Sequence, residues 1–281
     1  MRVNAFGSTG RNVAIIGQGT WYIEAAQRAD AVAALQRGID LGMTHIDTAE
    51  MYGSGAAEDI VGEAIAGWRD RVFLVSKVLP QNASHKGTIK ACEASLRRLK
   101  TDRLDCYLLH WRGPVPLSET IAAMGDLVRT GKIRAWGVSN FDADDLEEAL
   151  SIAGSGQIAC NQVLYHLRER AIEHAVIPWC EQNRVAVVAY SPFGHNGFPS
   201  SQSPGGRVLA EIGEAHGATV HQVALAFLTR RPSVFAIPKA ANQSHVSQNA
   251  GAGDLVLTPE EVGRIDRAFP LGRRPSSLPM L

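Results

Sequence analysis

The stretch GMTHIDTAEMYG, residues 42–53, decides how the rest of the chain is interpreted. Residues 44–47 have the composition of a short buried strand that follows a helix, with Gly42 as a plausible helix stop. Asp47 stands where this strand would end, and Tyr52 lies on the turn beyond it. Asp47 could instead cap a helix starting near Ala56, and Tyr52 could fill a surface groove. The rest of the sequence must decide between a proton-transfer site and these structural roles.

Apolar runs of strand length alternate with helical segments along the whole chain. Because the runs are continuous rather than alternating, both faces of the sheet are expected to be buried, as in a parallel sheet covered by helices. Eight such units predict an α/β fold, a single (β/α)8 barrel domain over residues 1–281, with a short N-terminal β-hairpin within residues 3–16. Strands are expected over residues 14–21, 44–47, 72–77, 104–110, 135–140, 158–164, 185–190 and 234–238.

The helices are expected between these strands. Ser118 is expected to cap one of them and Asp142 to open the next, while residues 194–206 form a loop rich in Ser, Gly and Pro. Residues 207–230 are expected to supply one or two helices. The remaining helices are expected over residues 25–41, 56–68, 86–99, 118–130, 171–183 and 259–268.

Composition excludes several classes of partner. The 281 residues contain 28 Lys+Arg and 28 Asp+Glu, so the formal net charge is zero and no nucleic-acid or membrane partner is expected. No segment approaches the ~20 apolar residues that span a bilayer, and the N-terminus has no apolar signal region. The four cysteines show no CxxC spacing and are interpreted as core residues of a cytoplasmic protein. The oligomeric state stays open, with a monomer favoured.

Polar residues stand at the carboxyl end of nearly every expected strand. In a (β/α)8 barrel these ends meet at one rim, where active sites gather. The polar strand ends are Gly19-Thr20-Trp21, Asp47, Lys77, His110, Ser139-Asn140, Gln162, Tyr190-Ser191 and Lys239.

Four of these rim residues suggest acid–base chemistry. A tyrosine has an ordinary pKa near ~10, and an adjacent lysine ammonium is expected to lower the pKa of Tyr52. Asp47 would keep Lys77 charged and in place. The phenol could then protonate a carbonyl oxygen as hydride arrives at carbon, while His110 donates a hydrogen bond to the same oxygen.

With these rim residues, the chain resembles the aldo-keto reductase family. The family's signatures look like Gly42-x4-Asp47-Thr48-Ala49-x2-Tyr52-Gly53, GKIRAWGVSNF at residues 131–141, and Ile237-Pro238-Lys239. The resemblance extends from Gly17-x-Gly19-Thr20-Trp21 to the helix near Asn249, most of the chain.

The resemblance implies a barrel that binds NADPH across its mouth and reduces aldehydes or ketones. It makes Tyr52 the general acid/base, Lys77 and Asp47 its tuning pair, and His110 the residue that orients the substrate, with Trp21 and Trp111 as further substrate walls. Ser139, Asn140 and Gln162 would hold the nicotinamide carboxamide, and Tyr190 would stack on the ring. The implied cofactor residues are Gly19, Thr20, Asp47, Ser139, Asn140, Gln162, Tyr190, Ser191, Pro192, Phe193, Gly194, Ile237, Lys239, His245, Gln248 and Asn249.

Two positions depart from the family pattern. Ala240 follows the lysine where Ser or Thr is usual, and His245 stands where an arginine normally clamps the 2′-phosphate of NADPH. Neutral histidine cannot make the bidentate contact of arginine, so NADPH is expected with a weakened preference, and NADH is possible.

Other functions remain as alternatives. The same fold could be a catalytically idle nucleotide-binding redox sensor. A metal-dependent hydrolase using His45, Asp47, Lys77 and His110 would leave Tyr52 and the Ile237-Pro238-Lys239 motif unexplained. A Rossmann dehydrogenase fails because Tyr22 occupies the position of its third glycine.

Overall fold

The computed structural model describes residues 1–195 and 197–281. Within these residues eight parallel strands are hydrogen-bonded in sequence order from β3 to β10 and form one curled sheet. Every strand pairs with the next one along the chain, as expected of successive βα units. The strands of this sheet are β3 (Gln18–Gly19), β4 (His45–Asp47), β5 (Phe73–Val78), β6 (Leu104–Leu109), β7 (Ile133–Ser139), β8 (Ile158–Leu164), β9 (Ala186–Tyr190) and β10 (Val234–Ala236).

The sheet closes into a barrel where its first and last strands meet. Parallel bridges join Ile16 to Ala236 and Gly19 to Lys239. The amide of Gly17 donates to the carbonyl of Ala236 at 2.8 Å. Gly19 is required at this junction, because a Cβ there would lie 2.6 Å from the carbonyl oxygen of Ile237. The first and last βα units are therefore held together by backbone contacts.

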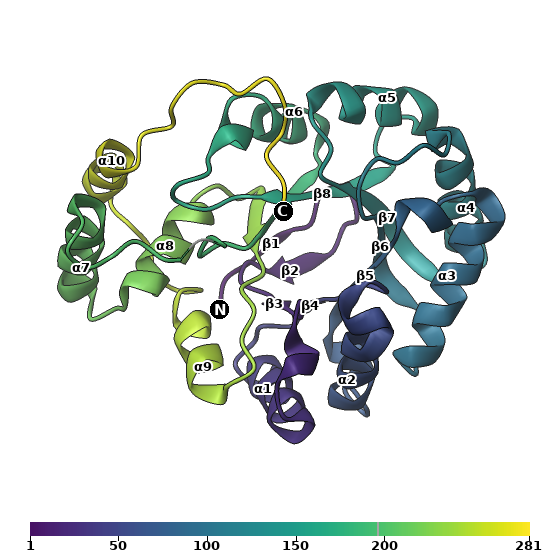
Figure 1. Cartoon of the computed structure of the whole chain (residues 1–281), viewed down its shortest axis with the longest axis horizontal. Coiled ribbons are helices and arrows are strands. Elements are labelled where there is room, and N and C mark those ends of the chain that lie inside the picture. Colours follow the sequence, from purple (N-terminus) through teal and green to yellow (C-terminus); the bar gives the residue numbers. More distant parts are fainter. Residues whose placement is uncertain (196) are drawn as a thin grey trace.

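Helices surround the strands, as Figure 1 shows in a view along the barrel. Short 3-10 turns η1 (Ile23–Ala25), η2 (Tyr52–Gly55), η3 (Arg69–Arg71), η4 (Pro80–Asn82) and η5 (Ala171–Glu173) lie between the longer elements. The α-helices are α1 (Arg28–Asp40), α2 (Ala56–Ala64), α3 (His85–Arg98), α4 (Leu117–Arg129), α5 (Ala143–Ala153), α6 (Val176–Asn183), α7 (Pro204–His216), α8 (Val220–Leu228), α9 (Gln243–Gly251) and α10 (Pro259–Ala268).

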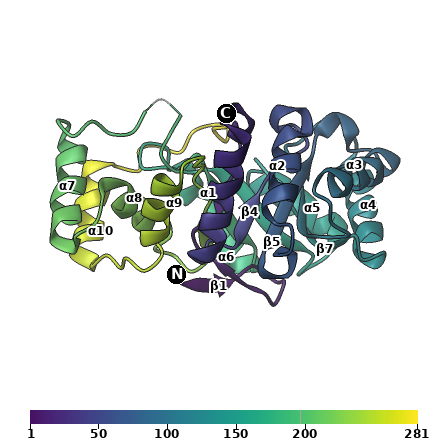
Figure 2. The same cartoon turned by 90° about the horizontal axis from the view of Figure 1, so that it is seen from below.

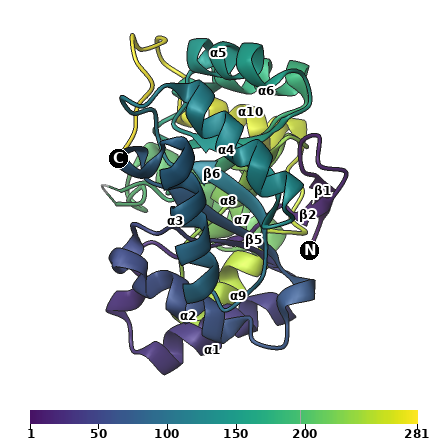
Figure 3. The same cartoon turned by 90° about the vertical axis from the view of Figure 1, so that its right-hand side faces the viewer.

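A hairpin covers the amino-terminal end of the barrel, which we call the base. Its strands β1 (Val3–Ala5) and β2 (Asn12–Ala14) are antiparallel, and Phe6 between them is fully buried against Phe73 and Phe235. Figures 2 and 3 show this hairpin at one end of the molecule and the C-terminal tail at the opposite end. We call that opposite end, where the strands finish, the mouth.

The architecture confirms the predicted (β/α)8 barrel and its hairpin, and β8 has the predicted bounds. Asp142 caps α5 and α10 spans the predicted residues. The prediction that Ser118 caps a helix was wrong. The α4 helix begins one residue earlier, at Leu117, because the carbonyl oxygen of Pro116 already accepts a hydrogen bond from the amide of Glu119.

Further segments differ from their expected bounds. The strand expected over residues 14–21 is only Gln18–Gly19, and the helices expected over residues 25–41 and 56–68 are Arg28–Asp40 and Ala56–Ala64. The helix expected over residues 171–183 is broken into η5 and α6, whereas the 207–230 segment lies in two helices, α7 and α8, as the prediction of one or two helices allowed. The predicted loop 194–206 is shorter because α7 begins at Pro204, and its residue 196 lies outside the described residues. Cys92, Cys106, Cys160 and Cys180 are buried and free, as predicted for core cysteines. None of the described helices combines the length and the apolarity that a bilayer crossing requires.

Candidate active site

The β4 strand places its side chains alternately inside and outside the barrel. His45 and Asp47 point inward, whereas Ile46 faces the helices, because successive strand residues alternate between faces. After β4 the chain turns sharply through η2, where Gly53 and Gly55 adopt positive φ angles of 54° and 96°. A Cβ at Gly53 would lie 2.6 Å from the side chain of Glu24. This turn brings the side chain of Tyr52 back over the end of β4.

Lys77, from the end of β5, joins Asp47 to Tyr52. Its ammonium donates to Asp47 Oδ1 at 2.6 Å, to the carbonyl oxygen of Thr48 at 2.9 Å and to the hydroxyl of Tyr52 at 3.0 Å. The second carboxylate oxygen of Asp47 accepts from Gln162 Nε2 at 2.7 Å. Both charged side chains are fully buried. These contacts occupy the three donors of the lysine, so the position of its charge beneath the phenol is fixed. The α2 helix follows Gly55 and has no side-chain cap hydrogen bond, so the alternative of Asp47 as a helix cap was wrong.

Burial changes the proton affinities of this triad. Burial alone would lower the pKa of Lys77, but Asp47 and Tyr52 outweigh it and raise the pKa above its usual value. Burial raises the pKa of Asp47, and Lys77 and Gln162 oppose that rise. Burial also raises the pKa of Tyr52; the Lys77 ammonium lowers it, but by less. The prediction that Lys77 makes the phenol acidic was therefore wrong for the free protein. Its effect has the expected sign, but desolvation of the buried phenolate is larger, so Tyr52 is a protonated phenol at neutral pH.

His110 follows β6 and faces Tyr52 across the cavity. The two rings lie 5.8 Å apart, edge to face. Burial and the nearby Lys77 charge lower the pKa of His110 to about 2, so the imidazole is neutral. Its Nδ1 is buried with no hydrogen-bond partner among the described residues. At a buried position without a partner, a ring nitrogen that is a bare acceptor costs less free energy than one that carries an N–H donor. We therefore assign the proton to Nε2. His110 can then donate one hydrogen bond into the cavity.

A chain of hydroxyl and amide groups lines the other side of the cavity. Ser139 Oγ donates to the carbonyl oxygen of Gln162 at 2.8 Å, and Asn140 Nδ2 donates to the carbonyl oxygen of His110 at 3.2 Å. Tyr190 donates its hydroxyl to Asn140 Oδ1 at 2.9 Å. Asn140 and Ser191 both have positive φ, at 60° and 48°. Such backbone conformations in residues other than glycine are uncommon and concentrate at functional sites.

These residues enclose a cavity of about 250 Å³ at the mouth of the barrel. The predicted substrate residues Trp21, Tyr52, His110 and Trp111 all line it. The predicted cofactor residues that line it are Gly19, Thr20, Asp47, Ser139, Asn140, Gln162, Tyr190, Ser191, Pro192, Phe193, Gly194, Ile237 and Lys239. Lys77 lies beneath the floor, and His245, Gln248 and Asn249 are on α9, outside the lining.

Two residues that line the cavity, and one that stacks on its wall, were not predicted. Met51 and Leu281 line it, and the amide of Leu281 donates to the hydroxyl of Tyr190 at 3.3 Å. His195 stacks on Trp21 with ring centroids 6.0 Å apart. Met51 and Leu281 are apolar residues without a motif, so only their position in the fold could identify them. His195 follows Gly194 directly, and that adjacency was a usable signal.

The metal-site alternative gains no support from the arrangement. Across residues 1–195 and 197–281, no group of three or more His, Cys, Asp and Glu side chains is placed to hold a metal ion. His45 lies at the base, where its ring contacts Phe6 and Phe73, rather than with the rim residues.

Comparison with known proteins identifies the family. The sequence profile described as "Aldo/keto reductase family" matches residues 15–269. Methylglyoxal reductase YeaE of Escherichia coli (strain K12) is 50% identical over 268 residues, which cover 95% of this chain and 94% of that protein. Glyoxal reductase of Bacillus subtilis (strain 168) is 33% identical, covering 84% and 83%.

Solved structures agree with these sequence relatives. A crystal structure of an aldo/keto reductase from Klebsiella pneumoniae in complex with NADP and acetate superposes with a TM-score of 0.93 at 49% identity, covering 100% of both chains. The same identity and TM-score hold for a Klebsiella pneumoniae aldo-keto reductase in complex with NADPH. With the profile match spanning most of the barrel and a curated relative at half identity, the chain belongs to the aldo/keto reductase family of oxidoreductases.

Proposed function

We propose that this protein reduces aldehydes or ketones to alcohols with NADPH, and that Tyr52 delivers the proton. The observation that carries the proposal is the Lys77 ammonium, which bridges Asp47 at 2.6 Å and the Tyr52 hydroxyl at 3.0 Å beneath an open cavity. A structural ion pair would have no need to contact a phenol that lines a pocket. Such a contact is what general acid catalysis requires.

The residues around the cavity fit the proposed cofactor. Ser139, Asn140 and Gln162 present hydroxyl and amide groups suited to a carboxamide, and the half-buried ring of Tyr190 offers a flat apolar face. The segment 191–194 would lie along the pyrophosphate, and Lys239 supplies a positive charge at the far edge. Bound there, NADPH would supply the hydride.

The protein's own residues account for the proton. Tyrosine is protonated at neutral pH and burial raises the pKa of Tyr52 further, so its hydroxyl can donate to a carbonyl oxygen that gains charge. Lys77, 3.0 Å from that hydroxyl, then stabilises the phenolate that remains, and Asp47 keeps the ammonium in place. His110 donates a second hydrogen bond to the same oxygen and fixes its position.

The proposed substrates are small carbonyl compounds. A cavity of about 250 Å³ that must also admit the reactive end of a nucleotide leaves space for a compact substrate. Trp21 and Trp111 form apolar walls beside Tyr52. The relative that shares 50% identity is named a methylglyoxal reductase. We therefore propose small 1,2-dicarbonyl compounds as the first substrates to assay.

The decisive experiment is Tyr52→Phe, which removes only the phenolic oxygen. We expect kcat for methylglyoxal reduction to fall by about 10³-fold, within the range of general acid catalysis, because no other acidic group occupies that position. The NADPH dissociation constant, measured by quenching of protein fluorescence, should stay within about twofold of wild type, since the proposed cofactor contacts are unchanged.

The matched control is Tyr22→Phe. Tyr22 stacks on Trp21 at 4.7 Å beside the same cavity, but its hydroxyl does not reach Lys77. Its kcat should remain within about twofold of wild type. Retained turnover in Tyr52→Phe would falsify the assignment of the acid. Tight NADPH binding without turnover of any carbonyl compound by the wild-type protein would favour the redox-sensor alternative.

A further inference from the structure

Glu50 lies between β4 and the turn that carries Tyr52, in one of the two unspecified positions of the signature. Its side chain is half-buried and is not part of the cavity lining. The carboxylate oxygen Oε1 accepts from the amide of Leu79 at 2.7 Å and from Asn82 Nδ2 at 3.0 Å. Both donors follow β5, the strand that carries Lys77. Glu50 therefore joins the segment that leads to Tyr52 to the segment that follows Lys77.

The Glu50 side chain continues the pairing of β4 with β5 beyond the end of β4. The amide of Thr48 donates to the carbonyl oxygen of Val75 at 2.9 Å. Two residues later, the amide of Glu50 donates to the carbonyl oxygen of Lys77 at 3.5 Å. In a parallel ladder the next bond would run from the Leu79 amide to the backbone carbonyl of residue 50. The carboxylate of Glu50 accepts that bond instead, so the two segments stay paired while the backbone leaves the sheet.

The turn that follows has a costly backbone conformation. Gly53, Ser54 and Gly55 have consecutive positive φ angles of 54°, 53° and 96°. In Ser54, which is not glycine, such a conformation persists only where the surrounding structure holds it. Tyr52 lies between this segment and Glu50. If the contacts of Glu50 were lost, the turn could relax and the side chain of Tyr52 would move with it.

We propose that Glu50 is a positioning residue for proton transfer: it fastens the turn that carries Tyr52 to the end of β5 and so holds the phenol within hydrogen-bond distance of Lys77. The inference rests on the proposed function, because it concerns the same acid. The three donors of the Lys77 ammonium are occupied by other groups, and Glu50 does not line the cavity. Its effect on the reaction therefore passes through Tyr52.

This role requires an acceptor oxygen rather than a negative charge. Both donors to Glu50 are neutral, one a backbone amide and the other a side-chain amide. Burial raises the pKa of Tyr52, and the charges that act on that pKa are those of Lys77 and Asp47, not that of Glu50. Glutamine at position 50 would keep the acceptor oxygen, whereas alanine would leave the Leu79 amide without it.

Glu50→Ala in the full-length protein tests the anchor. We expect the single-turnover rate of NADPH oxidation by methylglyoxal, per folded molecule, to fall by between about 10-fold and about 10²-fold. A displacement of about 1 Å between reacting groups can have an effect of this size. The NADPH dissociation constant should stay within about twofold of wild type, because the proposed nicotinamide contacts lie on the other side of the cavity.

Two further variants grade the effect. Glu50→Gln should restore the single-turnover rate to within about threefold of wild type, because the acceptor oxygen returns. Asn82→Ala removes one of the two donors and leaves the Leu79 amide in place. It should lower the rate by only about threefold. Denaturant unfolding of each variant gives the folded fraction by which the rates are corrected.

A double-mutant cycle with Tyr52→Phe separates positioning of the phenol from any other effect. If Glu50 acts through Tyr52, Glu50→Ala should change the residual rate of the Tyr52→Phe variant by less than about twofold, because no phenol remains to be positioned. If Glu50 acts on another group, the two losses multiply.

Glu169→Ala is the matched control. Glu169 is also half-buried and also accepts from a backbone amide, that of Ala171 at 2.9 Å, in the loop after β8. That loop does not carry the proposed acid, so the single-turnover rate should stay within about twofold of wild type.

The outcomes distinguish this inference from the function on which it rests. A wild-type rate in Glu50→Ala, an equal loss in Glu50→Gln, or multiplied losses in the double variant would each overturn the positioning role, while the reductase assignment stands. A wild-type rate in Tyr52→Phe would instead remove the proposed acid and the role of Glu50 together.

Discussion

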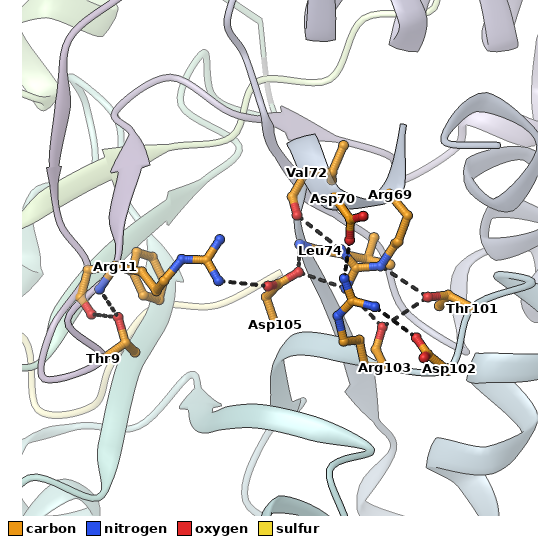
Figure 4. Close-up of polar contacts among 11 residues, drawn as sticks. Thr9, Arg11, Arg69, Asp70, Val72, Leu74, Thr101, Asp102, Arg103 and Asp105 are labelled. Atoms are coloured by element: carbon orange, nitrogen blue, oxygen red, sulfur yellow. Dashed lines mark hydrogen bonds and ion pairs between the residues drawn. The ribbon is translucent and has the colours of Figure 1, made fainter. Parts of the chain in front are cut away.

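Each end of the barrel buries one carboxylate and one histidine, and the two ends use them differently. At the base, Asp105 of β6 accepts from Arg69 at 2.7 Å, from the amide of Leu74 at 3.0 Å and from Arg11 of the hairpin at 3.4 Å (Figure 4). At the mouth, Asp47 accepts from Lys77 and Gln162. Both carboxylates are buried and paired, so burial and charge alone do not identify a functional site.

The two carboxylates differ in whether the groups that contact them belong to a network that can exchange a proton. Arg69 is effectively always charged and Leu74 contributes a backbone amide, so nothing around Asp105 exchanges protons at working pH. Lys77 contacts a titratable phenol that faces a cavity. Likewise, His45 at the base is enclosed by Phe6, Phe73 and Phe235, whereas His110 at the mouth lines the pocket. Access and an exchangeable partner distinguish the mouth from the base.

The largest expected effect comes from Lys77→Met, which removes the charge at the mouth and keeps most of the side-chain volume. We expect kcat for carbonyl reduction to fall about 10³-fold or more, because the phenolate left after proton transfer loses its counter-charge. NADPH affinity should change little. Steady-state kinetics and fluorescence titration measure the two quantities, and normal turnover would remove Lys77 from the mechanism.

Asp105→Asn tests the base of the barrel, where we expect stability to fall while kcat is retained. We expect the free energy of unfolding to fall by about 3 kcal/mol, because Arg69 loses its buried counter-charge. The kcat per folded molecule should stay within about twofold of wild type. Denaturant unfolding gives the first value. Asp70→Asn, an exposed partner of Arg103 at the same end, is the control and should cost less than about 0.5 kcal/mol. A loss of kcat in Asp105→Asn would show that the two ends are not independent.

The buried histidine of the base gives a pH-dependent effect that is small near neutral pH. Burial lowers the pKa of His45 to about 3, so between about pH 6.5 and that value the unfolded chain binds a proton that the folded protein does not. Stability is therefore lost as pH falls through this window. His45→Phe removes that loss, and its stability relative to wild type should improve by about 1.4 kcal/mol for each pH unit below about 6.5. Denaturant unfolding at several pH values measures the slope, and a constant difference across the window would contradict it.

The sequence was sufficient for the barrel and for most of the mouth. Strand ends in a parallel barrel share one rim, so position along the chain translates directly into position in space. For this reason Asp47, Lys77, His110, Gln162 and Tyr190 could be brought together from spacing alone. Their placement matches the prediction, and their catalytic and binding roles stay proposals.

Other features depend on three-dimensional surroundings that spacing does not encode. The pKa direction of Tyr52 depends on desolvation, which a sequence pattern does not measure, and that prediction was wrong. Met51 and Leu281 enter the cavity through the path of a turn and of the tail. One domain over residues 1–281, the cytoplasmic location and the favoured monomer stay predictions.

The junction between β3 and β10 has a consequence for how the protein is made. The strand around Gly17 and Gly19 emerges early from the ribosome, yet its partners at Ala236 and Pro238 are synthesised more than 200 residues later. Until then the growing sheet has two unpaired edges, and unpaired edges promote aggregation. Chains released before residue 238 would have a sheet with two unpaired edge strands. We therefore expect the cell's chaperones to bind the nascent chain until the barrel closes.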